Sequence, residues 1–368
     1  MRSDTRPEAS AAGTVGGERS ESDKPQMSIE LRIDVSQAVP LASPVLVEIA
    51  ASVYLPPADA IANPPVVMFA SPGGGYSRGY FDLQFSGHER YSEAEHHVRR
   101  GIVFVAYDHL GVGDSTVPDI DCITLEMLAA ANDAAVRAIA ARIEEGTLTP
   151  RLPPLPRPFR IGVGQSMGGC ITIAMQGLHR TFDAIAVLGY SAIHTVPPLK
   201  DPAKRQGLID ATRALNRRTD PTTLSIEERT SSHTDDDMSY PHHWEDVPKE
   251  IVRADTPKGF AFRKSGTWPP AWRSASMPRC ALIMLSPGCV ASEAAAITVP
   301  VLTAMGERDV CPEPHHEAAA YCNSPDVSLY IAPRMAHMHN FASTRALLWE
   351  RIVAWALMVA RNARSSLA

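Results

Sequence analysis

Residues 159–169 read FRIGVGQSMGG, and the expected fold is built outward from them. Alternate residues in the first half of this stretch are apolar, which favours a β-strand. An apolar, alanine-bearing segment follows at 170–178 and favours a helix. Ser166 therefore stands where a strand becomes a helix, inside the pattern Gly-x-Ser-x-Gly that holds a nucleophilic serine in a strained turn. Gly164 and Gly168 are required because a Cβ at either position would collide with its neighbours.

Strand and helix signals alternate along most of the 368-residue chain. The first two strands are expected to pair antiparallel, and the short apolar runs that follow are typical of strands buried on both faces. This alternation predicts an α/β fold with a mostly parallel, doubly wound sheet flanked by helices. The expected strands are 28–37, 45–55, 66–70, 102–107, 159–163, 184–189, 299–304 and 327–331. The expected helices are 86–100, 121–146 (Asp121 as N-cap, Gly146 as stop), 170–178, 315–321 and one from Ser343.

The regular alternation stops in residues 194–296, which are polar, irregular and punctuated by proline. This pattern predicts a cap inserted into a core made of residues 27–193 and 297–368. Residues 1–26 contain no aromatic side chain and are rich in Gly, Ser, Glu, Arg and Lys. Such a composition predicts a disordered tail.

The bulk composition is that of an ordinary globular protein. Hydrophobic residues make up 45% of the chain and charged residues 21%, with a formal net charge of -6. No basic stretch indicates a nucleic acid, and the tail lacks the apolar region of a secretory signal. Residues 342–360 are apolar but interrupted by charges at helical spacing, which predicts an amphipathic helix rather than a membrane span. The six cysteines show no C-x-x-C spacing, so we expect reduced thiols, a cytoplasmic location and no membrane partner.

A serine hydroxyl needs a neighbouring imidazole to take its proton as it attacks. His337 is the preferred base for Ser166, because it lies four residues beyond Pro333, which ends the strand at 327–331. His339 is the alternative base.

The imidazole in turn needs a carboxylate that orients it and stabilises its charged form. Asp309 follows the strand at 299–304 and gives the chain order serine, acid, histidine. Glu307 and Glu313 are alternative acids. Asp108, at the end of another strand, is expected to be a structural hydrogen-bonding residue, and Asp114 and Ser115 are read as turn residues.

Attack on a carbonyl also requires backbone N–H groups that stabilise the oxyanion. One is expected from Met167, the residue after the nucleophile. The other is expected from Gly74, with Gly73 and Gly75 as neighbouring candidates, because three glycines let the backbone approach a substrate. Tyr76 could add a hydroxyl or simply pack. The tryptophans of the insertion could line a substrate pocket together with Tyr76 or hold the cap together; they are Trp244, Trp268 and Trp272.

Together these motifs resemble those of the α/β-hydrolase superfamily over about residues 45–360. The matching pieces are the glycine turn 73–75, Asp108-x-x-Gly111-x-Gly113-x-Ser115, the elbow 164–168, Gly306-x-x-Asp309 and His337. The chain departs from the family in having Ser71-Pro72-Gly73 where His-Gly is common, and no glycine directly before His337. The resemblance implies a catalytic triad of Ser166, Asp309 and His337 that works without a cofactor.

Histidine pairs at 96–97, 242–243 and 315–316, and the His-x-His spacing at 337–339, raise the question of a metal. No carboxylate or cysteine recurs at matching spacing, so surface or capping roles are expected and no metal is predicted.

The sequence thus favours a serine hydrolase that cleaves a carboxylic ester, lactone or thioester of a small, partly apolar substrate. A serine at the elbow disfavours the epoxide-hydrolase and dehalogenase branches of the superfamily, which carry aspartate there. The alternatives are a carbon–carbon bond hydrolase or acyltransferase on the same triad, and a small-molecule receptor of the same fold. The oligomeric state is left open, with a homodimer as one option.

Overall fold

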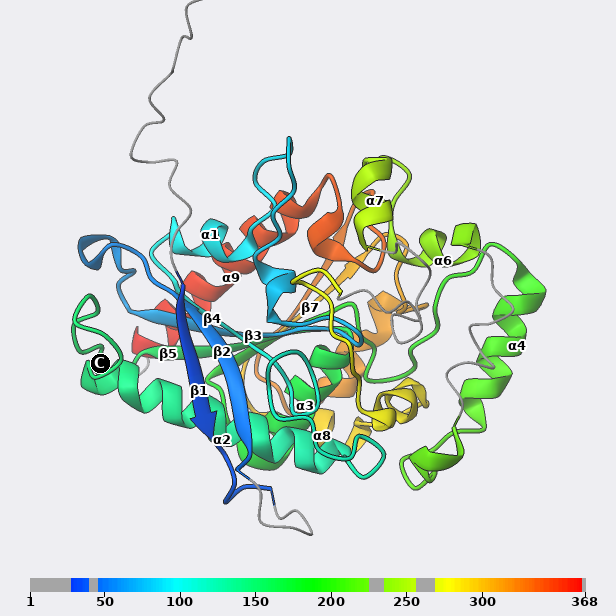
Figure 1. Cartoon of the computed structure of the whole chain (residues 1–368), viewed down its shortest axis with the longest axis horizontal. Coiled ribbons are helices and arrows are strands. Elements are labelled where there is room, and N and C mark those ends of the chain that lie inside the picture. The colour runs from blue at the N-terminus through cyan, green and yellow to red at the C-terminus, as the bar shows by residue number, and fades with distance from the viewer. Residues whose placement is uncertain (1–27, 40–45, 225–234, 256–268, 366–368) are drawn as a thin grey trace, which may run out of the picture.

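The computed structural model describes residues 28–39, 46–224, 235–255 and 269–365. In this part of the chain eight strands form one sheet in the order β1-β2-β4-β3-β5-β6-β7-β8 (Figure 1). The expected mostly parallel α/β sheet is confirmed. Strand bounds are β1 Ile29–Asp34, β2 Glu48–Tyr54, β3 Val66–Ser71, β4 Val103–Tyr107, β5 Phe159–Gln165, β6 Ala184–Leu188, β7 Val301–Gly306 and β8 Val327–Ala332.

The first three strands along one edge are antiparallel, as β1 pairs with β2 and β2 with β4. From β4 onward every neighbouring pair is parallel, so the carboxyl ends of β3 to β8 meet at one edge of the sheet. Residues of β3, β4 and β7 are buried along their whole length. Continuous apolar runs are stable there because helices cover both faces of the sheet.

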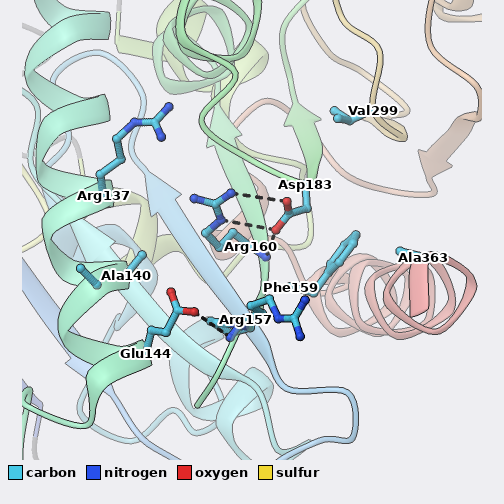
Figure 2. A pocket seen from close by; sticks show the side chains of 11 residues that line it. Arg137, Ala140, Glu144, Arg157, Phe159, Arg160, Asp183, Val299 and Ala363 are labelled. Atoms are coloured by element: carbon cyan, nitrogen blue, oxygen red, sulfur yellow. Dashed lines mark hydrogen bonds and ion pairs between the residues drawn. The ribbon is translucent and has the colours of Figure 1, made fainter. Parts of the chain in front are cut away.

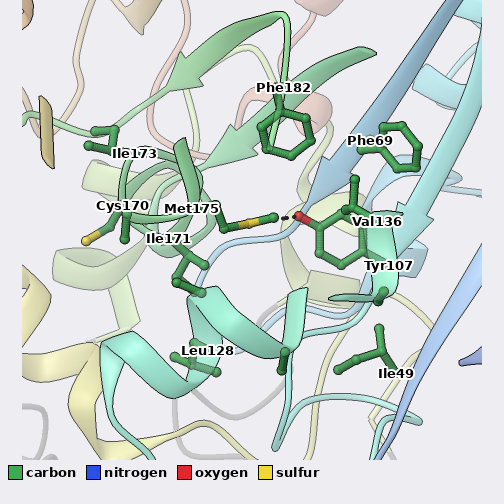
Figure 3. Close-up of a cluster of buried hydrophobic side chains, with 14 of the residues drawn as sticks. Ile49, Phe69, Tyr107, Leu128, Val136, Cys170, Ile171, Ile173, Met175 and Phe182 are labelled. Atoms are coloured by element: carbon green, nitrogen blue, oxygen red, sulfur yellow. Dashed lines mark hydrogen bonds between the residues drawn. The ribbon is translucent and has the colours of Figure 1, made fainter. Parts of the chain in front are cut away.

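Side chains of successive strand residues enter two hydrophobic clusters, one on each face. In β3, Val67 and Phe69 join the cluster under α2 (Leu125–Glu145), α3 (Met167–His179) and α8 (Ala291–Ala295). Met68 and Ala70 join the cluster under α1 (Glu93–Val98) and α9 (Arg345–Ser365). Figure 3 shows part of the first cluster, in which the Tyr107 hydroxyl lies 3.7 Å from the Met175 sulfur.

The other α-helices are α4 Pro202–Arg213, α6 Asp235–His242 and α7 Lys249–Asp255. The 3-10 helices are η2 Ala58–Ala60, η3 Arg78–Phe81, η4 Pro221–Thr223, η6 Arg279–Leu285, η7 Pro314–Tyr321 and η8 His339–Phe341.

The start of α2 differs from its expected position. Thr124 caps the helix through a hydrogen bond from the Met127 N–H, whereas Asp121 accepts a hydrogen bond from Arg279 at 2.6 Å. Gly146 ends the helix in the left-handed conformation, φ 71°, as expected.

Two other expected helices are also altered. The one expected at 86–100 is confined to α1, because Ser92 caps it and residues 85–92 form short bridges instead. The segment at 315–321 is the 3-10 helix η7.

The segment between β6 and β7 contributes α4, α6 and α7, which lie beyond the end of the sheet at the right and upper right of Figure 1. Its last part returns to the core, since Val290 and Ala294 belong to the cluster that includes α3. The boundaries 194 and 296 of the predicted cap stay a prediction, and the predicted tail 1–26 lies outside the described residues. No helix in the described ranges is both long and apolar enough to cross a bilayer.

Candidate active site

Ser166 occupies a strained turn between β5 and α3, with φ 54° and ψ -117°. The glycines on either side leave the space this turn needs. A Cβ on Gly164 would lie 2.3 Å from the Gly168 carbonyl oxygen, and a Cβ on Gly168 would lie 2.3 Å from the carbonyl oxygen of Ser71. Such distances are far below van der Waals contact, so the expected steric requirement is confirmed. The turn presents the serine hydroxyl at the carboxyl edge of the sheet.

His337 connects this serine to a carboxylate. Its Nε2 lies 2.9 Å from Ser166 Oγ, and its Nδ1 lies 2.7 Å from Asp309 Oδ1. The His337 side chain is only 8% exposed. Its backbone is also held, because the Gln165 side chain donates to its carbonyl at 3.0 Å. The structure therefore brings the three predicted residues, which are distant in sequence, into one hydrogen-bonded row.

The Asp309 carboxylate is buried at the end of β7. The backbone N–H of Gly306 donates to Oδ2 at 2.8 Å, and that of Val310 donates to Oδ1 at 2.7 Å. Burial by itself would raise the pKa of Asp309, but the neighbouring His337 and His339 and their hydrogen bonds hold that pKa well below its usual range. The carboxylate is therefore ionised at neutral pH, as the orienting acid of a triad must be.

The glycine turn after β3 lies against the nucleophile. A Cβ on Gly73 would lie 2.3 Å from the Gln165 Oε1 and 3.1 Å from the Ser166 Cβ. A Cβ on Gly74 would lie 3.9 Å from the Met167 Cβ. Met167 is the first residue of α3, and the first N–H groups of a helix have no acceptor within that helix. Both predicted oxyanion donors therefore come from backbone next to Ser166.

A protein-family model matches most of the chain. Residues 66–359 match the model of the "Alpha/beta hydrolase family". The chain belongs to the α/β-hydrolase family. No curated protein sequence matches it.

Solved structures show the same fold at low sequence identity. A thermophilic esterase from Thermogutta terrifontis is 15% identical, with a TM-score of 0.54 over 89% of this chain and 99% of that one. The peroxisomal α/β-hydrolase Lpx1 of Saccharomyces cerevisiae is 13% identical, with a TM-score of 0.56 over 91% and 88%. A haloalkane dehalogenase variant from Bradyrhizobium elkanii is 13% identical, with a TM-score of 0.55 over 92% and 99%. Similarity at this level of sequence identity shows the fold only. The reaction has to be inferred from the geometry and chemistry of the site.

The alternative site residues of this α/β-hydrolase have other hydrogen-bond partners or are exposed to solvent. His339 Nε2 contacts Asp309 Oδ2 at 2.7 Å, on the opposite carboxylate oxygen from His337. Glu307 accepts the backbone N–H of Arg334 at 2.8 Å, and the Glu313 side chain is 73% exposed. The geometry therefore favours His337 as the base and Asp309 as the acid.

Asp108 has the structural role that the sequence predicts. It accepts the backbone N–H groups of Arg78 at 2.6 Å and Asp114 at 2.9 Å, and it pairs with the Arg78 guanidinium. A Cβ on Gly113 would lie 2.3 Å from its carboxylate. Burial raises the pKa of Asp108, against the opposing effect of Arg78.

Tyr76 lies directly after the glycine turn and is fully buried. Its hydroxyl donates to Asp255 at 2.7 Å, so this hydroxyl is directed at α7. Asp255 also accepts from Trp272 Nε1 at 3.1 Å and lies 3.0 Å from His243 Nε2. Sequence reasoning missed Asp255, because a single aspartate at the end of a short helix carries no signal that it becomes buried. This cluster ties the inserted segment to the glycine turn.

The remaining tryptophans occupy different places. Trp244 is half-buried, and the Arg308 guanidinium lies 4.6 Å from its ring centroid. Trp272 is also half-buried and packs edge-on against Phe85 and Phe341. Trp268 lies outside the described residues.

A surface pocket at the other edge of the sheet, shown in Figure 2, contains none of the predicted site residues. It is formed around the start of β5, where Arg160 pairs with Asp183 and Glu144 accepts the Arg157 backbone N–H. Within the described ranges no group of three or more His, Cys, Asp or Glu side chains is arranged to hold a metal.

Proposed function

We propose that this α/β-hydrolase cleaves a carboxylic ester, lactone or thioester of a small, partly apolar substrate through an acyl-enzyme on Ser166. The observation that carries the proposal is the hydrogen-bonded row from Ser166 Oγ through His337, with contacts of 2.9 and 2.7 Å, to the buried Asp309. This is the arrangement that converts a serine hydroxyl into a nucleophile at neutral pH.

The reaction would proceed in two halves. Ser166 Oγ attacks the substrate carbonyl while His337 Nε2 takes its proton, and Asp309 stabilises the imidazolium that forms. The N–H groups of Met167 and Gly74 stabilise the oxyanion, and the protonated His337 then donates its proton to the leaving group. Water deprotonated by His337 releases the acyl group and restores the serine. These steps require no cofactor.

Side chains next to the oxyanion turn support an apolar acyl group. A Cβ on Gly74 would lie 2.9 Å from the Met277 sulfur and 3.9 Å from the Met167 sulfur. Two thioethers therefore border the site, and methionine adapts well to apolar ligands of irregular shape. The serine at the elbow also separates this chain from the aspartate-bearing branches named above. The six cysteines are free, which is consistent with the cytoplasmic location that we propose.

The test is covalent labelling followed by turnover. A fluorophosphonate probe should label the wild-type protein and Ser328→Ala, a control on the edge strand β8, but not Ser166→Ala. A short-chain nitrophenyl ester should be hydrolysed by the first two proteins and at least about 10³-fold more slowly by the third. Labelling that persists in Ser166→Ala would refute the proposal.

The reaction class requires a second experiment. Esters, lactones and thioesters should be compared in one panel, with Ser166→Ala as the blank. A carbon–carbon hydrolase would leave the panel uncleaved but turn over a substrate with a ketone next to the scissile bond. An acyltransferase would form products with an added alcohol acceptor in preference to water. A receptor would bind ligand without releasing product.

A further inference from the structure

The Asp309 carboxylate is shared by two imidazoles, one on each oxygen. His337 Nδ1 lies 2.7 Å from Oδ1, and His339 Nε2 lies 2.7 Å from Oδ2. The side chains of His339 and Asp309 are each 1% exposed, so this contact is shielded from water. A triad needs only the first of these contacts.

The acceptor chemistry determines which nitrogen of His339 carries its proton. An ionised carboxylate only accepts hydrogen bonds, so Nε2 of His339 must donate. The Gly306 N–H also donates to Oδ2, the oxygen that His339 contacts. The Val310 N–H and His337 Nδ1 donate to Oδ1. Each carboxylate oxygen therefore has two donors, and the group cannot rotate without losing several of them.

The side chain of the residue after His339 anchors this part of the chain. The next residue, Asn340, donates to Glu93 at 2.7 Å and accepts from Trp349 Nε1 at 2.9 Å, in a buried cluster. Space for the two histidines and the acid is provided by Gly189. A Cβ there would lie 3.2 Å from His337 Nδ1 and 3.2 Å from His339 Cε1.

Other ionisable groups that face this cluster have partners of their own. The ring centroid of His242, from α6, lies 6.1 Å from that of His337. The Tyr80 hydroxyl, from η3, accepts the Asn340 N–H at 3.1 Å. In the loop after β7, Glu307 accepts the N–H of Arg334. Arg308 pairs with Glu245, and Glu317 accepts a hydrogen bond from the Ser191 hydroxyl. Of the described side chains, only the two histidines have a hydrogen bond to the Asp309 carboxylate in the structure.

We propose that His339 is a positioning residue for the triad: as a proton donor to Oδ2, it fixes the Asp309 carboxylate and moderates its pull on His337. This inference rests on the proposed function. A donor on Oδ2 withdraws negative charge from the carboxylate, so less charge stabilises the protonated form of His337.

Two substitutions test this role. His339→Gln retains an N–H near the position of Nε2, whereas His339→Phe retains a flat ring but no donor. For His339→Phe we expect kcat to fall about tenfold with little change in KM, because one charge-assisted hydrogen bond is lost. The acid limb of its kcat/KM profile should move to higher pH, because loss of the donor leaves more negative charge on the Asp309 carboxylate beside His337. His339→Gln should stay close to wild type in both respects.

The outcomes separate this inference from the proposed function. Absence of labelling at Ser166 in the wild-type protein would refute the proposed function itself. Normal labelling of wild type, combined with an unchanged rate and pH profile in His339→Phe, would overturn only the role of His339. Equal losses in the Gln and Phe variants would also overturn it, because the donor would then be irrelevant.

A measurement on the wild-type protein covers the case in which His339→Phe fails to fold. Nitrogen-15 NMR of labelled histidines, assigned with His339→Gln, reports which ring nitrogen is protonated. The inference requires a proton on Nε2 of His339 at neutral pH. A proton on Nδ1 alone would contradict it, whatever the activity of the enzyme.

Discussion

The backbone N–H of His337 donates to the carbonyl oxygen of Pro241 at 3.0 Å. The next N–H, of Met338, donates to the His242 carbonyl at 2.9 Å. Pro241 and His242 belong to α6, in the segment inserted between β6 and β7. The proposed catalytic base is therefore held by this segment as well as by the core.

Arg308 secures the same part of the segment, so its loss should disturb the base. Its Nη2 donates to the His243 carbonyl at 2.8 Å, and its guanidinium lies 3.9 Å from the Tyr240 ring centroid. For Arg308→Ala we expect kcat/KM on a nitrophenyl ester to fall roughly tenfold, since small displacements of a catalytic group are costly. Arg213→Ala, on the exposed side of α4, is the control and should retain full activity. Equal activity of the two variants would show that the contact has no influence on the site.

Asp309→Asn should remove most of the activity without changing the fold. An amide cannot hold His337 in the required tautomer, and the expected loss in kcat is roughly 10³ to 10⁴-fold. Fluorophosphonate labelling rates and kcat can be measured on the same preparation. Glu307→Gln, two residues earlier in the loop, should be nearly as active as wild type. A large loss in Glu307→Gln and none in Asp309→Asn would reverse the assignment of the acid.

Asp309 should also make stability depend on pH. Its pKa is held well below the usual range in the folded protein, chiefly by His337 and His339 acting against burial. A carboxylate with a lowered folded pKa contributes stability above its unfolded pKa, about 3.9, and this contribution is lost as pH falls from there toward the folded pKa. The difference in unfolding free energy between wild type and Asp309→Asn should therefore shrink below about pH 4. Urea unfolding at several pH values measures it, and a constant difference would contradict the expectation.

Asp255→Asn should weaken the attachment of α7 to the glycine turn. Burial would raise the pKa of Asp255, but His243, Arg273 and Tyr76 lower it, so the group is a buried anion. Replacing it leaves its partners poorly satisfied, at a cost of roughly 2 to 4 kcal/mol in unfolding free energy. The matched control on the same helix is Glu250→Gln, whose carboxylate is 65% exposed. Urea unfolding compares the two, and equal stability would show that the buried cluster adds little.

Gly164→Ala should abolish function, because its Cβ would lie 2.3 Å from backbone that cannot move aside. Gly207→Ala provides the opposite control. Gly207 is exposed in α4, and nothing lies within 4 Å of an added Cβ. Alanine should stabilise that helix by about 0.5 to 1 kcal/mol through its helix propensity. Circular dichroism melts and Ser166 labelling on both variants test the pair, and an active Gly164→Ala would disprove the steric argument.

Much of the fold could be predicted because its signals are local. The buried strands appear as short apolar runs, and the Gly-x-Ser-x-Gly turn carries its steric requirement within five residues. The end of α2 at Gly146 was also predictable, because a left-handed cap favours glycine. The start of α2 was not. Asp121 and Thr124 are both good N-caps in sequence. In the structure Thr124 caps the helix, and the Asp121 carboxylate pairs instead with Arg279, which is distant in the chain.

By itself the sequence determined the chain order of the proposed serine, acid and histidine and placed each of them after a strand, since those features depend on neighbouring residues. Only the tertiary structure distinguishes His337 from His339 as the proposed base. Both follow the same strand, and both bind Asp309, but only His337 extends its other nitrogen to Ser166 Oγ. The same holds for Asp255, whose partner Tyr76 is 179 positions away in the chain. Such contacts arise when the sheet and its insertion pack together, and no local pattern encodes which polar groups will then meet.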